Sequence, residues 1–536
     1  MPVARCLVVA VSLSFVASLV PLQARPPVEL VQRGRFLGGA TAASEIVAYD
    51  AGTRRLFVTN GAQNRIDVLN ISNPDVPTLV FSIPLAAFGG NVNSVAARNG
   101  LVAAAIEGIP RTGPGRIVLF SAGGTLLRSF AAGTQPDHVS FSPDGRFVLS
   151  ANEGELDANI DPAGSVSIVD LAPGVSKATI TTLGFSAFDA ESANLRAAGV
   201  RIFPGRLPSV DFEPEYIAVS PDSQRAWVTL QEANSFAIVD LTVGAITGIR
   251  AIPLIDHAQT GNRLDVSDGG GTAGGGPLIN IANWPVFGMH MPDTVAAFSL
   301  GGATFYASAG EGDSRAAGTS DEVRVGAAGY VLDPGVFPNA ATLKTNSQLG
   351  RLTVSSIDGN LDADSEIERI QVFGSRSLSI FDAAGTRIFD SGEALEQFTA
   401  AAFPLAFNST HDANNSFDTR SDNKGPEPEA LAVGTTPRGR TLAFVGLERI
   451  GGIATFDVSE PAGSRLVDYV NNRNFSATID LANAPAAAGD LGPEGITFIA
   501  AADSPDGQAM IAVASEISGT TTLYSVTEPL LSDGFE

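Results

Sequence analysis

The sequence predicts an all-β fold, a β-propeller of about seven four-stranded blades in the YVTN/WD40-like repeat class, with long loop insertions. The chain has 536 residues, which is more than one ordinary core accommodates unless the architecture repeats. Its 57 glycines and 32 prolines are typical of chains with many turns. A tight turn, SPDG or SPDS, recurs between apolar runs at Ser142–Gly145, Ser220–Ser223 and Ser504–Gly507.

A longer unit extends outward from these turns. It consists of an acidic residue, a strand, a turn, a second strand that ends in polar residues, a loop and a third strand. The unit begins about seven times, at Ser44, Asn93, Pro136, Pro214, Pro292, Pro428 and Pro493. Fourth strands are expected from Thr78, Thr125 and Ile246. The segment VELVQRGRFLG from Val28 is expected to supply the outer strand of the last unit, because closure removes unpaired strand edges.

Three insertions interrupt the repeat. Residues 185–199 contain a helical pattern, FDAESANLRAAG, and residues 256–290 are rich in glycine. The longest insertion, 315–426, contains ERIQVFGSRSLSIFDAAGTRIFDSG, a hairpin expected to complete the fifth blade. No linker separates a second domain, so one propeller domain is expected over 28–528, with a short tail at 529–536.

The first residues are typical of a secretory signal. Arg5 precedes an apolar run from Cys6 to Val20, and the small Ala24 follows, so a signal peptide is expected over residues 1–24. The apolar run is shorter than the about 20 residues of a membrane span, and no later stretch qualifies. Cys6 is the single cysteine, so a mature chain would carry no disulfide. The expected location is secreted: periplasmic, extracellular or associated with the cell surface.

The net charge of −24 argues against nucleic acid and anionic membrane surfaces as partners. Cations are the natural small partners of such a chain. Solubility outside the cell would also account for the charge, so the acidity alone does not define a site.

Aligning the units places acidic residues at two repeated positions. The first position precedes or starts the first strand, and its residues are Glu45, Asn93, Asp137, Glu215, Asp293, Glu429 and Glu494. The second follows the second strand, and its residues are Asn60, Glu107, Glu153, Glu232, Glu311, Glu448 and Glu516. Since the first strand of each blade lines the channel, two acidic rings are expected near one mouth. Acids at these points also cap turns, which is the alternative for each single residue.

A ring of carboxylates needs compensation. Two carboxylates about 5 Å apart repel by roughly 3 kcal/mol at an effective dielectric constant of 20. Protons, basic partners or a bound cation would relieve this repulsion. Four basic residues that lie close in sequence could serve as partners, although they are fewer than the acids: Arg315, Arg420, Lys424 and Arg449. The candidate metal ligands are Glu153, Glu155, Glu215, Glu311, Asp313, Glu427, Glu429 and Glu494. Oxygen ligands favour Ca²⁺ first and Mg²⁺ or Mn²⁺ next, whereas the four scattered histidines do not favour zinc.

A second candidate metal loop is DGNLDADSE, from Asp358 to Glu366. Oxygens alternate along it as in the front half of a calcium loop. They belong to Asp358, Asn360, Asp362 and Asp364. Ala363 and Arg369 stand where a calcium loop has its Gly and its last Glu, and a solvated acidic turn is the alternative reading.

Several segments resemble the choice-of-anchor I family of secreted and surface proteins. They are ANEGE (Ala151–Glu155), EPEYIAVSPD (Glu213–Asp222), MPDTVAAF (Met291–Phe298), GEGDSR (Gly310–Arg315), the Asp358 loop with FGSRSLSIFD (Phe373–Asp382), FDTRSDNKGPEPE (Phe417–Glu429) and GPEG (Gly492–Gly495). The resemblance implies a propeller. It also implies kinship with mesenchyme-specific cell surface glycoproteins and with some proteins called atypical alkaline phosphatases.

Two functions follow from these features. One is a binding or structural propeller with a divalent metal, Ca²⁺ first, at its acidic mouth, and with a surface or matrix partner. The other is a metal-dependent phosphoester hydrolase, in which Arg315, Arg420 and Lys424 would bind the phosphate. Catalysis needs an open coordination position and a structural site does not. No organic cofactor is expected, and neither G-x-S-x-G nor H-E-x-x-H occurs.

Overall fold

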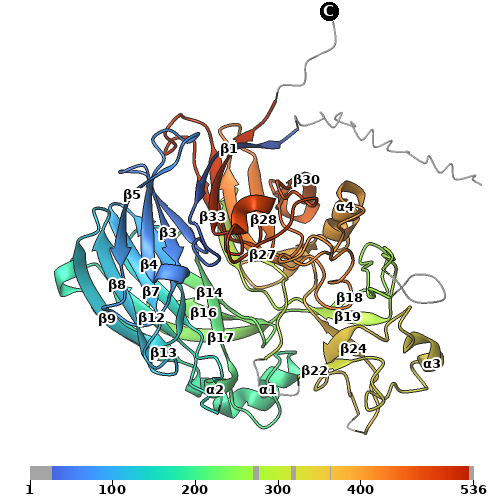
Figure 1. Cartoon of the computed structure of the whole chain (residues 1–536). Helices are drawn as coiled ribbons and strands as arrows, with labels where there is room; N and C mark the ends of the chain where they lie inside the picture. The colour runs from blue at the N-terminus through green and yellow to red at the C-terminus, as the bar shows by residue number, and fades with distance from the viewer. Residues whose placement is uncertain (1–26, 158, 270–276, 316–320, 363, 530–536) are drawn as a thin grey trace, which may run out of the picture.

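The computed structural model describes residues 27–157, 159–269, 277–315, 321–362 and 364–529. The expected signal peptide, residues 530–536 of the expected tail and part of the glycine-rich insertion lie outside the described residues. Strands dominate the rest, as the turn-rich composition predicts (Figure 1).

The described residues form seven antiparallel four-stranded sheets, and all but the last are built from one sequence unit each. The first three contain β2 (Val47–Asp50), β3 (Arg55–Asn60), β4 (Arg65–Asn70) and β5 (Thr78–Pro84); β6 (Val92–Arg98), β7 (Leu101–Ile106), β8 (Pro114–Ser121) and β9 (Leu126–Thr134); and β10 (Pro136–Phe141), β11 (Phe147–Asn152), β12 (Ser165–Asp170) and β13 (Thr179–Gly184). The next three contain β14 (Pro214–Val219), β15 (Arg225–Leu230), β16 (Ser235–Asp240) and β17 (Ala245–Ala251); β20 (Val295–Leu300), β21 (Ala303–Ala309), β25 (Leu378–Asp382) and β26 (Arg387–Asp390); and β27 (Pro428–Thr435), β28 (Thr441–Leu447), β29 (Ile453–Asp457) and β30 (Arg465–Val470).

The last sheet joins the two ends of the described chain. It contains β31 (Pro493–Ile499), β32 (Met510–Ser515), β33 (Thr520–Thr527) and, as its outer strand, β1 (Glu29–Leu37). β1 pairs antiparallel with β33, from Glu29 opposite Thr527 to Leu37 opposite Thr520, which confirms the expected role of the Val28 segment. The first strands of the seven sheets contact one another in the order β2, β6, β10, β14, β20, β27, β31 and back to β2. This closed order is that of a β-propeller (Figure 1).

Local chemistry and burial explain the sheets. In the turn after β10, the Ser142 hydroxyl accepts the Phe147 N–H at 2.8 Å and donates to Asp144 at 2.6 Å. Gly145 takes a φ of +73°, a region that favours glycine. Apolar side chains then pack between neighbouring sheets, as Phe57 of β3 does with Val102 of β7. Removing this surface from water is the main force that holds the sheets together.

The insertions build a lobe beside the ring (lower right in Figure 1). It contains a sheet of β18 (Ile255–Asp256), β19 (Val286–Met289) and β24 (Ile370–Phe373), and a hairpin of β22 (Glu322–Arg324) and β23 (Thr353–Ser355). Its hydrophobic core is separate from those between the blades and includes Leu264, Tyr330, Leu352 and Val372.

This lobe corrects one expectation. β25 and β26 complete the fifth sheet as predicted, but β24 pairs in parallel with β19 instead. The reason is that all four residues of β24 are buried in the lobe, whereas the blade already has four strands.

The described helices are short and lie in the connections. α1 (Ser192–Ala197), preceded by the 3₁₀ turn η3 (Ser186–Glu191), confirms the helical pattern in the first insertion. The others are α2 (Pro208–Asp211), α3 (Ala340–Leu343) and α4 (Ala394–Ala402), with 3₁₀ turns η1 (Gly61–Gln63), η2 (Val175–Lys177), η4 (Pro461–Gly463) and η5 (Pro485–Ala488).

Candidate metal centre

The first strands present their acidic residues through β-bulges. In four sheets a proline starts the first strand, an acidic residue follows it, and the pairing register skips that residue. β10, for example, pairs at Pro136 and again at His138, which leaves Asp137 unpaired. A bulge re-aims a side chain and increases the local twist. The repeated Pro-acid pair therefore turns one carboxylate per sheet away from the ladder.

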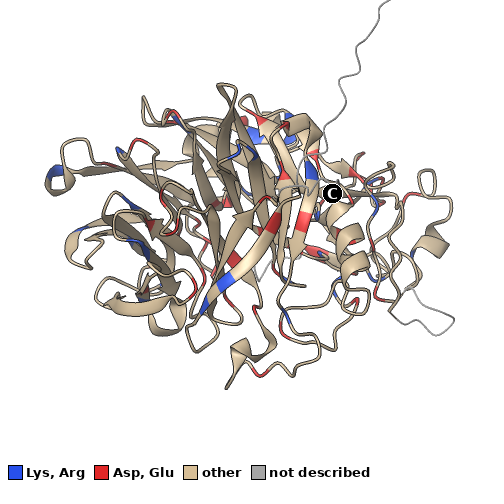
Figure 2. Ribbon diagram, turned by 90° about the horizontal axis from the view of Figure 1, so that it is seen from above, with Lys and Arg blue, Asp and Glu red and all other residues tan. Residues whose placement is uncertain are grey.

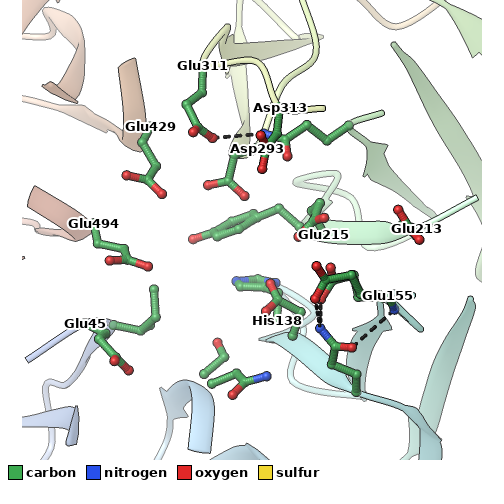
Figure 3. A pocket seen from close by; sticks show the side chains of 18 of the residues that line it. Glu45, His138, Glu155, Glu213, Glu215, Asp293, Glu311, Asp313, Glu429 and Glu494 are labelled. Atoms are coloured by element: carbon green, nitrogen blue, oxygen red, sulfur yellow. Dashed lines mark hydrogen bonds between the residues drawn. The ribbon is translucent and has the colours of Figure 1, made fainter. Parts of the chain in front are cut away.

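These carboxylates surround one open cavity of about 430 Å³. Its lining includes all seven residues of the predicted first ring: Glu45, Asn93, Asp137, Glu215, Asp293, Glu429 and Glu494. From the predicted second ring it includes Glu107, Glu153, Glu232 and Glu311, but not Asn60, Glu448 or Glu516. Figure 3 shows the carboxylates around the open centre of the cavity, and Figure 2 shows acidic residues on strands near the middle of the molecule.

The lining of the cavity is strongly unbalanced in charge. Thirteen of its 22 residues are Asp or Glu, and the single Arg or Lys among the 22 is Arg111. Arg111 pairs with Glu107 at 3.3 Å and with Glu155 at 2.5 Å. Eleven lining carboxylates thus remain for other partners, more than the nearby basic side chains can pair.

Among the described residues, two groups of three carboxylates that lie wholly in the lining of the cavity converge closely enough to share an ion. In each group, one oxygen per residue lies within 4.8 Å of the others. The groups are Asp137, Glu153 and Glu215, and Asp293, Glu311 and Glu429. Each takes both ring positions of one sheet and the first-ring position of the next. The repeat therefore builds the same arrangement twice, at the β10–β14 and β20–β27 junctions.

Burial raises the pKa of most of these acids, and neighbouring carboxylates raise it further. The pKa of Asp137 rises to about 7, that of Asp293 to about 6, and those of Glu45 and Glu311 to about 8. The pKa values of Glu153, Glu215, Glu232, Glu429 and Glu494 rise well above the usual range for the same reasons. The negative charges are thus unfavourable where they stand, unless a cation joins them.

Some of the oxygens have partners and others have none. Glu153 accepts a hydrogen bond from Gln135, and Glu311 accepts from Gln231 at 2.9 Å. Among the described residues, Oε2 of Glu232 and Oε2 of Glu429 are buried without a hydrogen-bond partner. The Glu232 residue is only 9% exposed. A buried carboxylate oxygen without a donor is costly, and a bound cation would satisfy it.

Glu427 has a different environment. It is fully buried and forms ion pairs with Arg420, with Lys424 at 3.3 Å and with Arg449 at 2.8 Å. Burial alone would raise its pKa, but Lys424, Arg420 and Arg449 lower it to about 2. Three basic side chains therefore already neutralise the Glu427 carboxylate, as a bound metal ion would.

The predicted phosphate-binding cations are all engaged in ion pairs. The Arg315 side chain is 1% exposed and bonds Asp161, Asp211 and Glu213 at 3.0–3.1 Å. Lys424 bonds Glu311 at 3.1 Å and lies 3.5 Å from Asp313. Arg420 bonds Glu427. Their role in phosphate binding stays a prediction.

The Asp358 loop does not converge as a calcium loop would. Asp358 accepts hydrogen bonds from Arg201 at 2.6 Å and from Ser355 at 2.7 Å. Asn360 donates to the backbone carbonyl of Asp364 at 2.7 Å. Asp362 and Asp364 instead group with Glu368, which the pattern of alternating oxygens missed.

Besides Glu213, the candidate ligand set missed five cavity acids: Asp137, Asp293, Glu232, Glu45 and Glu107. The signal for them was present in the sequence. Each occupies a ring position of the aligned repeat. The repeated position therefore marks these residues, although they do not stand in a local cluster of acids.

The chain belongs to the choice-of-anchor I domain family, whose model matches residues 45–461. It is 30% identical over 192 residues to Gigasin-3a of Magallana gigas, a match that covers 34% of this chain and 67% of that protein. It is 32% identical over 136 residues to the mesenchyme-specific cell surface glycoprotein of Strongylocentrotus purpuratus, covering 23% of this chain and 17% of that protein.

Similar solved structures include the Kuenenia stuttgartiensis hydrazine synthase, at 11% identity and a TM-score of 0.45, covering 91% of this chain and 97% of that one. Another is the β-propeller domain of Myceliophteria thermophila Cps50 (Swd1), at 9% identity and a TM-score of 0.43, covering 93% and 100%. Within the described residues, no helix has the length and apolar character needed to cross a bilayer.

Proposed function

We propose that this protein is a secreted or surface-associated seven-bladed propeller that binds divalent cations, Ca²⁺ first, at the acidic mouth of its channel. The role of the site is binding and structural. The observation that carries the proposal is the cavity itself, in which thirteen carboxylates face a single lining arginine. The kinship with a cell surface glycoprotein supports the surface location.

The Asp137, Glu153 and Glu215 group is the preferred position for the ion. Among the described residues, Asp137 and Glu215 form no salt bridge, so their charges are free to bind a cation. In the other group, Glu311 is already paired with Lys424. Hard carboxylate oxygens suit Ca²⁺, which accepts six to eight oxygen ligands in flexible geometry.

The alternative, a phosphoester hydrolase, has less support. A phosphate would need free cationic groups beside the metal, because the rest of the cavity is negative. Arg315, Arg420 and Lys424 are held by carboxylates instead.

Calorimetric titration of EDTA-stripped protein with CaCl₂ tests the proposal. Wild type is expected to bind Ca²⁺, and Glu215→Gln to bind it about tenfold more weakly, since one anionic ligand is lost. Glu29→Gln is the matched control, because Glu29 is exposed on β1. This substitution removes the same charge at a position away from the cavity. Equal affinity in the Glu215 and Glu29 variants, or no binding by wild type, would refute the site. Release of p-nitrophenol from p-nitrophenyl phosphate by wild type and its loss in Glu215→Gln would favour the hydrolase.

A further inference from the structure

A second cavity, of about 510 Å³, lies where the ring meets the inserted lobe. It is bounded by the segment after α1, the segment after β17, strands β19 and β24, and the Asp358 loop. Its volume falls within the about 300–1,000 Å³ of small-molecule sites, which favour junctions between structural units. None of its lining residues belongs to the acidic cavity.

One wall of this cavity is apolar. Ile252 and Met289 are buried within it, Leu254 and Ile357 are half-buried, and Leu361 stands at its rim with 59% of its surface exposed. An exposed leucine beside a partly apolar cavity gains free energy when an apolar group covers it.

The charged groups of the cavity are mainly arginines, in contrast to the acidic surface of the rest of the chain. Arg201 is neutralised by its ion pairs with Asp321 and Asp358. Arg196 donates only to the backbone carbonyls of Ile202 and Phe203. Neither Arg196 nor Arg369 has a carboxylate partner among the residues that the structure describes.

Arg369 is held in place with part of its guanidinium free. Its Nε donates to Gln371 Oε1 at 2.8 Å, and its guanidinium lies 5.8 Å from the centre of the Phe287 ring. Among the described residues its two Nη groups have no hydrogen-bond partner. A guanidinium fixed by one nitrogen presents the others as a fork that suits a carboxylate or a sulfonate.

We infer that this cavity binds a small organic anion with an apolar body, its anionic group on Arg369 and its apolar part against Leu254, Ile357 and Leu361. Charge complementarity selects the anion, because Arg369 and Arg196 are unneutralised beside an apolar wall. The cavity is independent of the proposed cation site.

The test uses the fluorescent probe 8-anilinonaphthalene-1-sulfonate, an anion with an apolar body, on the whole protein in EDTA. Wild type is expected to bind the probe with an increase in fluorescence. Arg369→Gln is expected to bind it about tenfold more weakly, since a charge-assisted hydrogen bond is lost. Leu361→Asn is expected to weaken binding as well, and because Leu361 is exposed this variant should fold normally. Arg438→Gln, at an exposed turn outside the cavity, is the matched control and should bind like wild type.

A competition experiment separates the contribution of the anionic group to binding from that of the apolar body. Octanoate is expected to displace the probe from wild type much better than octanol does, and this preference should disappear in Arg369→Gln. Three results would overturn the inference: no probe binding by wild type, unchanged affinity in both Arg369→Gln and Leu361→Asn, or equal displacement by octanol and octanoate. Near-ultraviolet circular dichroism of each variant shows that a loss of binding is not a loss of fold.

Discussion

Two sides of the channel mouth use the same residue type in opposite ways. At the start of β27, Glu427 is surrounded by Arg420, Lys424 and Arg449, and its pKa falls to about 2. At the start of β14, Glu215 is half-buried beside Glu153 and Asp137, and its pKa rises well above the usual range. The burial of a carboxylate therefore does not define its role. The nearby cations decide whether it is a structural ion pair or a site for an added ion.

The largest expected effect is a loss of stability when Glu427, which three basic side chains neutralise, is replaced. Glu427→Gln should lower the free energy of unfolding by about 3–5 kcal/mol, because three partly buried cations would lose their shared anion. Urea unfolding in EDTA, followed by circular dichroism, measures this. The control is Glu29→Gln, for which no change is expected. If the Glu427→Gln protein were as stable as wild type, Glu427 would not be a structural ion-pair residue, and the proposed contrast with Glu215 would be wrong.

The stability of the metal-free protein should depend on pH through the acids that have no basic partner. The pKa values of Glu45, Asp137 and Glu311 are raised to about 7–8 in the folded state, above those of an unfolded chain near 4. The folded state then binds more protons than the unfolded state between about pH 4 and 8, so stability should fall as the pH rises through this range.

Glu427 has the reverse sign, and its contribution is lost as the pH falls from about 4 to 2. Thermal unfolding from pH 2 to 9, in EDTA and in Ca²⁺, separates the two regions. Added Ca²⁺ should remove most of the fall at high pH, because it replaces the protons. A metal-free midpoint that rises steadily from pH 5 to 8 would contradict the assignment of raised pKa values.

A smaller effect is expected for the uncompensated carboxylate itself. Glu215→Gln should stabilise the metal-free protein by about 1 kcal/mol, since one repelling charge is removed. In saturating Ca²⁺ the same variant should be less stable than wild type, because it loses a ligand. The measurement is the unfolding midpoint in EDTA and in Ca²⁺. A lower unfolding midpoint than that of wild type in both conditions would show that Glu215 is a structural residue like Glu427.

The smallest effect concerns Arg111, the one basic residue in the lining. Its pairs with Glu107 and Glu155 are partly exposed and contribute little to stability, about 0–1 kcal/mol. Arg111→Gln should therefore tighten Ca²⁺ binding only about threefold, by removing a competing cation. Titration calorimetry at low and high salt checks this, and the gain should shrink as salt rises. Arg438→Gln should leave the affinity unchanged.

Much of the fold could be predicted from the sequence because its signals are local. The SPDG turns, the alternation of apolar residues and the Pro-acid pairs recur within each unit, and each determines its own turn, strand or bulge. The alignment of these units also predicts that the seven first-ring residues lie around one opening, and all seven line the acidic cavity. The role of the Val28 segment followed from the need to close the strand edges.

The insertions could not be predicted in the same way. β24 looks like a strand of the fifth blade, yet it pairs with β19, more than 80 residues earlier, because both are covered by the lobe's own core. Packing between distant segments decides such a choice, and no local pattern records it.

The identity of the compensated carboxylates was likewise decided only in three dimensions. Through the period of the repeat, the sequence predicts the first-ring residues that line the cavity, but it also predicts Glu448 and Glu516, which the lining does not include. It placed Glu427 and Glu215 in one class of candidate metal ligands, and it offered Arg315 both as a partner of the acids and as a candidate phosphate-binding residue. The tertiary structure carried Arg315 from the fifth unit to Asp211 and Glu213 beside β14, and gathered Arg420, Lys424 and Arg449 around Glu427. Electrostatic compensation depends on distances of a few ångströms between segments, and chain folding alone sets those distances.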